Sequence, residues 1–483
     1  GGSLTEQVPL SKHLPETLGA LRDSGYRYRP VKRELRENLL ARLRERVPVF
    51  TGLVGYDDTV IPQLVNGILA QHDLLLLGLR GQAKTRILRS LPELLDEWIP
   101  VVDGAELWDD PLEPQLSATR RRVEELGDRT PVRWVHREQR YHEKLATPDV
   151  TIADLIGEVD FVKHAEGRHL ADEATMHFGL VPRSNRGIFA LNELPDLAPR
   201  IQAGLFNVLE ERDVQIRGYP VRMNLDVLLV FSANPEDYTN RGRIVTPLKD
   251  RIGTVVRTHY PLGLPEAMRI TRENALIVRP EGQPQADLPR FVHEVIEETV
   301  RLARSSPHIN QQSGVSVRAS IAALESVVAG AERRAVTCRE PAIVPRLSDL
   351  DGMLPAFRGK IELLLAEDES AEDKLVAALL GEAVSNVAGN YFDVDDLEAV
   401  TTQFLGGKTS IEAGDDLPAA QIVENAGRIK GLLPVAEEVC RRAECPVGSA
   451  GHLAAAVELV LEALHVNNKL SKVALRSRTF YKR

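Results

Sequence analysis

Short runs of consecutive apolar residues alternate, in the first half of the chain, with stretches whose apolar residues recur every three or four positions. The short runs are typical of strands buried on both faces of a parallel sheet. They occur at Leu74–Leu77, Ile188–Leu191 and Val227–Phe231. The spacing of three and four is typical of amphipathic helices. It predicts helices over Val31–Arg46, Thr59–Ala70 and Pro199–Arg212. We therefore expect an α/β fold built on a parallel sheet.

Weaker patterns lie between these elements. Two segments resemble strands, Val101–Glu106 and Val132–His136, and Gln115–Leu126 resembles a helix. The charged stretch Asp154–Leu180 holds three histidines, His164, His169 and His177. A metal site there is conceivable, but the irregular spacing favours a solvated insertion.

Beyond Pro261 the helical spacing continues and the strand-like runs disappear. It predicts helices over Pro261–Ala275, Asp287–Arg304, Val317–Ala335, Leu347–Ala366, Asp373–Ala388, Leu417–Ala443 and Gly451–Leu464. Glu340–Arg346 contains two prolines and is interpreted as a linker. The basic residues of Lys469–Arg483 are interpreted as a solvated tail rather than a nucleic-acid contact.

The segment after Leu74–Leu77 has the order of a phosphate-binding loop: strand, glycine-containing turn, Lys-Thr, helix. Backbone N–H groups of such a loop and the helix N-terminus bind phosphates. Lys84 would reach the β and γ phosphates, and the Thr85 hydroxyl would ligate Mg²⁺. The candidate nucleotide-binding residues are Gly78, Arg80, Gly81, Gln82, Ala83, Lys84, Thr85 and Arg86. Ala83 stands where the general pattern has a second glycine, and an ordinary strand–turn–helix is the alternative interpretation.

A short loop before the helix that leads into this strand contains Val54 and Gly55. Its position suits contact with an adenine ring. A plain helix N-terminus capped by Asp57 or Asp58 is equally compatible with these residues.

Polar residues follow the other two buried runs. Asn192 and Glu193 come after the second run, at the carboxyl edge of the sheet, where ligands bind in open α/β sheets. Glu193 is a candidate to orient and deprotonate the water that attacks the γ phosphate. Asn192 stands where an Asp normally holds Mg²⁺ through water. Because an amide carries no charge, we expect weaker Mg²⁺ binding and slow hydrolysis.

Three further residues are candidates for the same chemistry. Asn234 follows the third buried run and could hydrogen-bond the attacking water or the γ phosphate; a simple turn residue before Pro235 is the alternative. Arg251 could neutralise charge on the transferred phosphoryl group across a subunit boundary, or form a surface pair with Asp250. Arg318 starts a helix and could close over the nucleotide.

Length and composition limit the class of protein. A chain of 483 residues is expected to form two or three domains. Its net charge of −10 argues against nonspecific nucleic-acid binding as the main function. The three cysteines, Cys338, Cys440 and Cys445, make a disulfide framework improbable and favour a reducing cytoplasm. No apolar run reaches membrane-spanning length.

In this order, the motifs resemble those of an AAA+ ATPase. More narrowly, the chain is similar to the magnesium-chelatase ATPase subunit and the related MoxR group. The matching segments are Phe178–Gly187, Asn234-Pro235-Glu236 and Leu248–Arg251, together with an insertion at about 160–180 and a hairpin at about 214–224. The resemblance covers about residues 45–335. It implies an AAA+ domain over 46–262 after an N-terminal helical extension over 1–45. A helical lid over 263–340 and a mostly helical C-terminal region over 341–483 would follow.

The resemblance also implies activity and partners. ATP and Mg²⁺ would bind between subunits of a ring, usually hexameric, in which Arg251 serves the neighbouring site. The ring would work on a partner that carries a von Willebrand factor A domain, by metal insertion or by remodelling. The helical C-terminal third departs from the compact chelatase subunit and favours a MoxR-like chaperone role. The alternative is a nucleotide-gated assembly scaffold with little hydrolysis. An activator of an alternative sigma factor would need a Gly-Ala-Phe-Thr-Gly-Ala-type loop, which the sequence lacks.

Overall fold

The computed structural model describes residues 14–159, 176–211, 223–239, 243–475 and 478–483. The chain forms two compact units. The first comprises Gly1–Gly78 and Ala83–His259, and the second comprises Leu79–Gln82 and Tyr260–Arg483.

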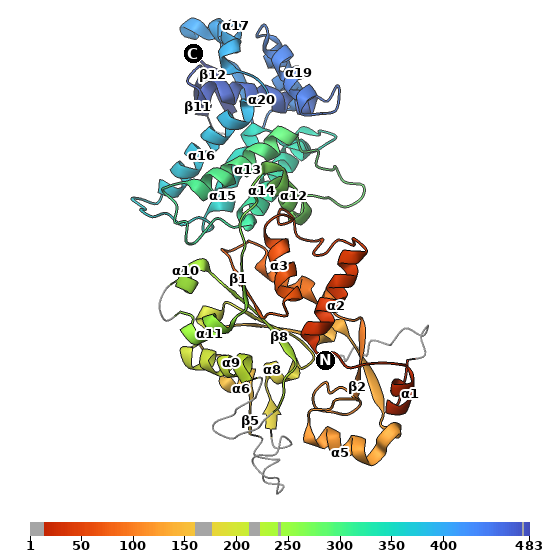
Figure 1. The fold of residues 1–483 in the computed structure, drawn as a ribbon. Coiled ribbons are helices and arrows are strands. Elements are labelled where there is room, and N and C mark those ends of the chain that lie inside the picture. Colours follow the sequence, from red (N-terminus) through yellow and green to blue (C-terminus); the bar gives the residue numbers. More distant parts are fainter. Residues whose placement is uncertain (1–13, 160–175, 212–222, 240–242, 476–477) are drawn as a thin grey trace. The chain divides into compact units, whose positions relative to one another are not determined.

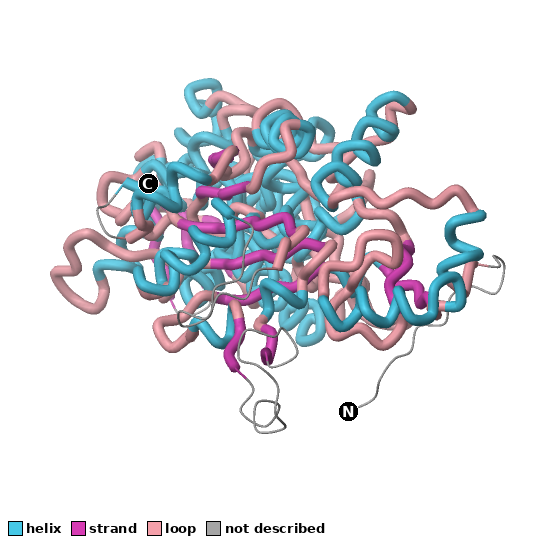
Figure 2. Tube along the Cα trace, turned by 60° about the horizontal axis from the view of Figure 1, so that its bottom comes forward, coloured by secondary structure: helices cyan, strands magenta, loops and turns pink. Residues whose placement is uncertain are grey.

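A five-stranded sheet is the centre of the first unit (Figures 1 and 2). Its order is β4-β7-β8-β1-β9, and all neighbouring strands are parallel. The bounds are β4 Tyr141–Leu145, β7 Gly187–Asn192, β8 Val227–Ala233, β1 Leu74–Leu77 and β9 Thr254–Arg257. Three of these strands are the predicted apolar runs. Because all five strands are parallel, their carboxyl ends lie at one edge of the sheet.

Helices cover both faces of this sheet. Side chains of a strand alternate between the two faces, so each strand contributes to two separate hydrophobic cores. Leu74 and Leu76 of β1 belong to one hydrophobic core, and Leu75 and Leu77 belong to another. The first core includes side chains of α2 Val31–Arg44, α3 Val60–Leu69 and α4 Lys84–Ser90. The second includes those of α6 Ile152–Leu155, α8 Leu180–Arg183, α9 Pro199–Glu211 and α11 Thr246–Arg251. The sheet is therefore buried on both faces, as its apolar runs predict.

The remaining elements of this unit are short. They are α1 Leu18–Asp23, β2 Trp98–Val102, α5 Ser117–Leu126, β3 Val132–His136, β5 Gly157–Val159, β6 Met176–Phe178 and α10 Pro235–Thr239. Four 3-10 turns lie at Leu91–Leu94, Gly127–Arg129, Arg137–Arg140 and Leu194–Asp196. Strand β2 pairs antiparallel with β3, outside the main sheet.

The strand predicted over Val101–Glu106 is displaced in the structure. Strand β2 begins at Trp98 and ends at Val102, and Gly104 then adopts a φ of 80°. A left-handed residue at this position turns the chain and ends the strand. The interpretation of Val101–Glu106 as a strand is therefore wrong beyond Val102.

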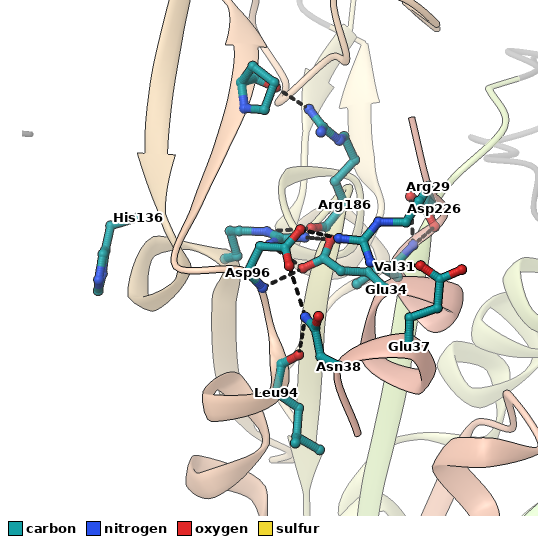
Figure 3. A network of polar contacts seen from close by, with 12 residues as sticks. Arg29, Val31, Glu34, Glu37, Asn38, Leu94, Asp96, His136, Arg186 and Asp226 are labelled. Carbon is teal, nitrogen blue, oxygen red and sulfur yellow. Dashed lines mark hydrogen bonds and ion pairs between the residues drawn. The ribbon is translucent and has the colours of Figure 1, made fainter. Parts of the chain in front are cut away.

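A network of polar contacts joins helix α2 to neighbouring segments of the first unit (Figure 3). Arg140 donates to both carboxylate oxygens of Glu34 on α2, at 2.7 and 2.8 Å, and both side chains are buried. The Val31 N–H donates to Asp226 at 2.9 Å, and Asn38 donates to the Leu94 carbonyl at 2.8 Å. Helix α2 thus packs against the main domain through polar contacts as well as its apolar face.

Helices dominate the second unit. They are α12 Leu264–Asn274, α13 Arg290–Ser305, α14 Val317–Cys338, α15 Met353–Phe357, α16 Ala371–Ala388, α17 Glu398–Thr401, α18 Ala419–Gly427, α19 Leu432–Arg442 and α20 Ala450–Val466. Three 3-10 segments lie at Leu347–Gly352, Val394–Leu397 and Thr402–Gly407. One hydrophobic core runs from Phe291 to Tyr481, so residues of 263–340 and of 341–483 are packed together.

Three predictions for this unit need correction. Glu340–Arg346, interpreted as a linker, is packed into the unit: Ile343 and Arg346 are each 1% exposed, and Arg346 pairs with buried Glu458 at 3.0 Å. The basic C-terminal segment is not a solvated tail. It forms β11 Ser471–Leu475 and β12 Arg478–Lys482, in an antiparallel sheet with β10 Ile411–Gly414. The helix predicted over Leu347–Ala366 is reduced to short pieces.

Several predictions fall outside the described residues. These are most of the hairpin at about 214–224 and the central part of the insertion with His164 and His169. Of the three histidines, His177 is described, on β6. Within the ranges that the structure describes, no group of three or more His, Cys, Asp or Glu side chains could hold a metal ion.

Candidate functional site

The loop between β1 and α4 has two left-handed residues. Gly81 has a φ of 74° and Ala83 a φ of 62°, and Lys84 is the first residue of α4. Left-handed backbone costs little for glycine and about 1–2 kcal/mol for other residues. The structure therefore gives a physical reason for a second glycine in the general pattern, and Ala83 occupies that position at some cost.

Lys84 is buried against backbone oxygens. Its Nζ donates to the Gly78 carbonyl and, at 3.4 Å, to the Ala233 carbonyl at the end of β8. Burial lowers the pKa of Lys84, while the carboxylates of Glu193 and Asp237 act in the opposite direction. The Ala233 carbonyl is adjacent in sequence to Ser232, whose Oγ accepts from the Glu193 N–H at 3.2 Å. Lys84 and the backbone of Glu193 are therefore both tied to the carboxyl end of β8.

Strand β7 ends at Asn192, and Glu193 follows with a φ of 58°. A non-glycine residue in this conformation is strained, and such residues are concentrated at functional sites. The Glu193 N–H donates to Ser232 Oγ at 3.2 Å, and Ser232 Oγ donates to Asn192 Oδ1 at 3.2 Å. Ser232 on β8 thus holds the end of β7 in place.

Asn192 makes a second contact that the sequence did not indicate. Its Nδ2 donates to Oε1 of Glu143 on β4 at 2.8 Å. Arg89 on α4 donates to the other oxygen, Oε2, at 3.1 Å. Both polar atoms of the Asn192 side chain are therefore hydrogen-bonded. The Glu143 carboxylate lies beside Asn192, the position at which an Asp was expected.

Of the other predicted polar residues, Asn234 lies at the same edge, whereas Arg251 comes just before β9 and so lies near the amino end of that strand, away from the carboxyl edge. Asn234 follows β8, the strand between β1 and β7, and helix α10 begins directly after it. Arg251 ends α11, where its Nε contacts Glu210 Oε2 at 2.7 Å. The pair is therefore with Glu210 rather than with the adjacent Asp250, and the Arg251 side chain is 47% exposed.

The loop with Val54 and Gly55 is tied to α4. Gly55 has a φ of 81°, and Arg86 donates to the Gly52 carbonyl at 3.4 Å. Tyr56 donates to the His259 carbonyl at 2.8 Å. This loop accordingly lies beside the helix that begins with Lys84 and the exposed residue Thr85.

Some candidates belong to the second unit. Arg80 Nε donates to the Ser313 carbonyl at 3.3 Å, and Gln82 accepts from the Leu79 N–H at 2.9 Å. Arg318 lies in the first turn of α14.

Sequence reasoning missed Glu143, Arg89, Ser232 and Asp237. Strand β4 reads Tyr-His-Glu-Lys-Leu, without the apolar run that marked the inner strands, because it is at the edge of the sheet. One signal was available: Thr85 and Arg89 are four residues apart on a helix and so share a face.

The donors present suit ATP and Mg²⁺. A buried lysine at a helix N-terminus, next to a loop of N–H groups, is suited to phosphate. The Thr85 hydroxyl, the Glu143 carboxylate and Oδ1 of Asn192 are oxygen atoms, the ligands that Mg²⁺ prefers. Bound Mg²⁺ would supply positive charge at the phosphates.

One family model matches part of the chain. The family model described as the Sigma-54 interaction domain matches residues 135–256. No curated protein matches. Among solved structures, the chain is similar to NtrX from Brucella abortus, with 16% identity over 72% of this chain and 67% of that one, and a TM-score of 0.38.

Two further solved structures are similar to parts of this chain. A complex of the magnesium chelatase subunits BchI and BchD has 20% identity over 68% of this chain and 99% of that one, with a TM-score of 0.34. A putative ATPase from Cytophaga hutchinsonii has 16% identity over 74% and 97%, with a TM-score of 0.30. Because these TM-scores are low, the fold class rests on the strands of this chain.

None of the helices in the described ranges combines the length and the apolar character that a membrane span needs. The order and direction of the five strands, the loop between β1 and α4, and the helical second unit give the P-loop AAA+ α/β fold with a mostly helical C-terminal region.

Proposed function

We propose that this protein is an ATPase that binds and hydrolyses ATP in a ring and uses the cycle to remodel a partner protein. The observation that carries the proposal is geometric: buried Lys84 donates to the Ala233 carbonyl at the end of β8, and Glu193, at the end of the neighbouring strand β7, donates its N–H to Ser232 Oγ of β8. A buried cation next to a catalytic carboxylate is the arrangement that phosphoryl transfer to water needs.

In this proposal each residue has one task. Lys84 exchanges its carbonyl partners for the β and γ phosphates, and the N–H groups of Gly81–Thr85 bind phosphate oxygens. Glu193 orients the attacking water and accepts its proton. Asn234 hydrogen-bonds that water or the γ phosphate, and Thr85 ligates Mg²⁺. Val54 and Gly55 contact the adenine.

Two arginines, Arg251 and Arg318, reach the nucleotide only after a conformational change. Arg251 leaves Glu210 and neutralises charge at the site of a neighbouring subunit. The half-exposed pair with Glu210 is compatible with this exchange, since such surface pairs contribute only about 0–1 kcal/mol. Arg318 responds to the nucleotide from the helical lid.

The proposed subgroup, oligomer and partner follow from the sequence resemblance. We propose a MoxR-like chaperone ring, hexameric, whose partner carries a von Willebrand factor A domain; metal insertion is a less favoured task. A sigma factor is not proposed as partner, because the sequence has no Gly-Ala-Phe-Thr-Gly-Ala-type loop in the matched region or elsewhere.

Phosphate release and calorimetric nucleotide binding test the ATPase together. Lys84→Ala should abolish both ATP binding and turnover. Glu193→Gln should keep ATP binding and lose turnover by a factor on the order of 10² or more. Glu138→Gln, an exposed glutamate in a 3-10 turn, is the matched control and should leave both unchanged. Equal phosphate release from Glu193→Gln and wild type would remove the assigned role of Glu193.

The alternative is a nucleotide-gated scaffold. It is favoured by one observation, the neutral Asn192 in place of a carboxylate. A scaffold should assemble with ATP, as measured by sedimentation velocity, while releasing negligible phosphate. Assembly with ATP and no turnover in the wild-type protein would decide for this alternative.

A further inference from the structure

Glu143 and Asn192 lie on the same face of the sheet. In the parallel pairing of β4 and β7, Glu143 is opposite Ala190 and Leu145 is opposite Asn192. Ala190 and Asn192 are two residues apart and share a face, and Glu143 shares it as the partner of Ala190. Their side chains meet at 2.8 Å.

The charge at this point of the site is on Glu143. Asn192 is neutral, its Nδ2 is directed to Glu143, and its Oδ1 accepts from Ser232. The Glu143 side chain is 21% exposed, so part of it is accessible to solvent while most of it is covered by the protein.

The same carboxylate contacts the helix that carries Thr85. Arg89 lies one turn after Thr85 on α4, and residues at this spacing are neighbours on one helix face. Because Arg89 donates to Glu143 at 3.1 Å, Glu143 lies under the face of α4 that begins with Thr85. Glu143 therefore contacts the face of α4 on which Thr85 also lies, one turn nearer the helix N-terminus.

We propose that Glu143 supplies, from β4, the carboxylate of the divalent-cation site that position 192 lacks. This inference rests on the proposed nucleotide function. Asn192 holds the Glu143 carboxylate in place. Arg89 is its counter-ion when no cation is bound. Mg²⁺ keeps several of its waters in protein sites, so a carboxylate can act by accepting hydrogen bonds from bound water.

Arg89 is suited to being replaced by a divalent cation at the Glu143 carboxylate. The Arg89 side chain is 64% exposed, and its pair with Glu143 is therefore weak in water. A bound dication would replace Arg89 at little cost. The competing interpretation is that Arg89 and Glu143 only anchor α4 to the edge strand, and it makes different predictions for variants.

The test measures the affinity of Mn²⁺, as a paramagnetic substitute for Mg²⁺, by electron paramagnetic resonance. The full chain is saturated with a non-hydrolysable ATP analogue, so that turnover is not needed. Glu143→Gln keeps the size of the side chain and the hydrogen bond from Asn192. It should weaken Mn²⁺ binding about 10-fold or more, the effect typical of losing an outer metal partner.

A double variant moves the carboxylate from position 143 to position 192. Glu143→Gln combined with Asn192→Asp should restore Mn²⁺ affinity to within a few-fold of wild type. Arg89→Gln is the control for anchoring: it should leave Mn²⁺ affinity equal or tighter, because a competing cation is lost. Thermal unfolding of each variant reports whether the fold is kept.

The outcomes separate the two proposals. Unchanged Mn²⁺ affinity in Glu143→Gln, with normal binding of the nucleotide analogue, would overturn the role of Glu143 and leave the ATPase proposal standing. Equal losses in Arg89→Gln and Glu143→Gln, without rescue by Asn192→Asp, would assign the pair to anchoring and also overturn it. Failure of the wild-type protein to bind the analogue would instead refute the nucleotide function.

Discussion

At the scale of single residues, the proposed phosphate-binding role of Lys84 comes with a cost in the stability of the folded protein. Its ammonium group is buried in the folded, nucleotide-free protein and is compensated by two carbonyl oxygens. Desolvation of a charged group opposes folding unless strong partners are present. Ala83 and Glu193, both left-handed, add backbone strain at the same edge. Substitutions at these positions can therefore increase the stability of the folded protein while reducing its activity.

Replacing Lys84 by an apolar residue of similar length tests this balance. Lys84→Met should raise the melting temperature of the nucleotide-free protein and remove the stabilisation that ATP gives. Burial lowers the pKa of Lys84, so the unfolded chain binds more protons between the two pKa values. Wild-type stability should therefore rise with pH in the alkaline range, up to the unfolded pKa of about 10.4. Urea unfolding across this range should show no such rise in Lys84→Met.

The left-handed Ala83 predicts a graded response to side-chain size. Ala83→Gly should be within about 1 kcal/mol of wild type, since relief of strain offsets the greater freedom of glycine when unfolded. Ala83→Val should destabilise by more than about 1 kcal/mol, because a β-branched residue is poorly tolerated at positive φ. Urea denaturation measures both, and equal stability of the valine and alanine proteins would contradict the assigned backbone conformation.

At the scale of elements, buried ion pairs hold helices and strands in place. Glu34 joins α2 to Arg140, and the two side chains are 5% and 1% exposed. Removing one partner of a buried pair leaves an uncompensated charge and typically costs about 3–5 kcal/mol. Glu34→Gln should therefore lower the free energy of unfolding, measured with urea, by about 3 kcal/mol or more. Glu37→Gln on the same helix loses two more exposed pairs, with Arg33 and Arg29, and should cost only about 1 kcal/mol.

The C-terminal strands are part of the core of the second unit. Tyr481 is 4% exposed and donates to Glu462 on α20 at 2.5 Å. Truncating a buried aromatic side chain to alanine typically costs about 3–5 kcal/mol. We expect Tyr481→Ala to destabilise the second unit by an amount of this order, as measured by urea unfolding. Leu475→Ala on the neighbouring strand, where the side chain is 60% exposed, should be nearly neutral.

At the scale of the whole molecule, the proposed ring predicts complementation between inactive subunits. Arg251→Ala keeps its own Glu193 and should lose turnover by on the order of 10³-fold. Glu193→Gln keeps its own Arg251. In mixed rings, an Arg251 from one variant can serve the Glu193 site of the other. Mixing the two proteins should therefore restore part of the phosphate release. No recovery in rings shown to be mixed would mean that Arg251 does not act between subunits.

The predictable parts of the fold are those with a strong local pattern. The inner strands β1, β7 and β8 are apolar because both faces are buried, and this pattern is visible without coordinates. Strand β4 was missed, because an edge strand of mixed polarity resembles a loop. The linker and the tail were misread because Arg346 and Tyr481 are polar residues that only tertiary partners bury.

The sequence by itself determined the order of strand, phosphate loop and helix, and with it the class of fold. These features depend on residues that are adjacent in the chain. The placement of Glu143 beside Asn192 was decided only by the tertiary structure. The two residues are 49 positions apart and meet because parallel pairing brings the end of β4 next to the end of β7. A contact of that kind leaves no periodic trace in the sequence, since it depends on how the sheet is ordered and not on local spacing.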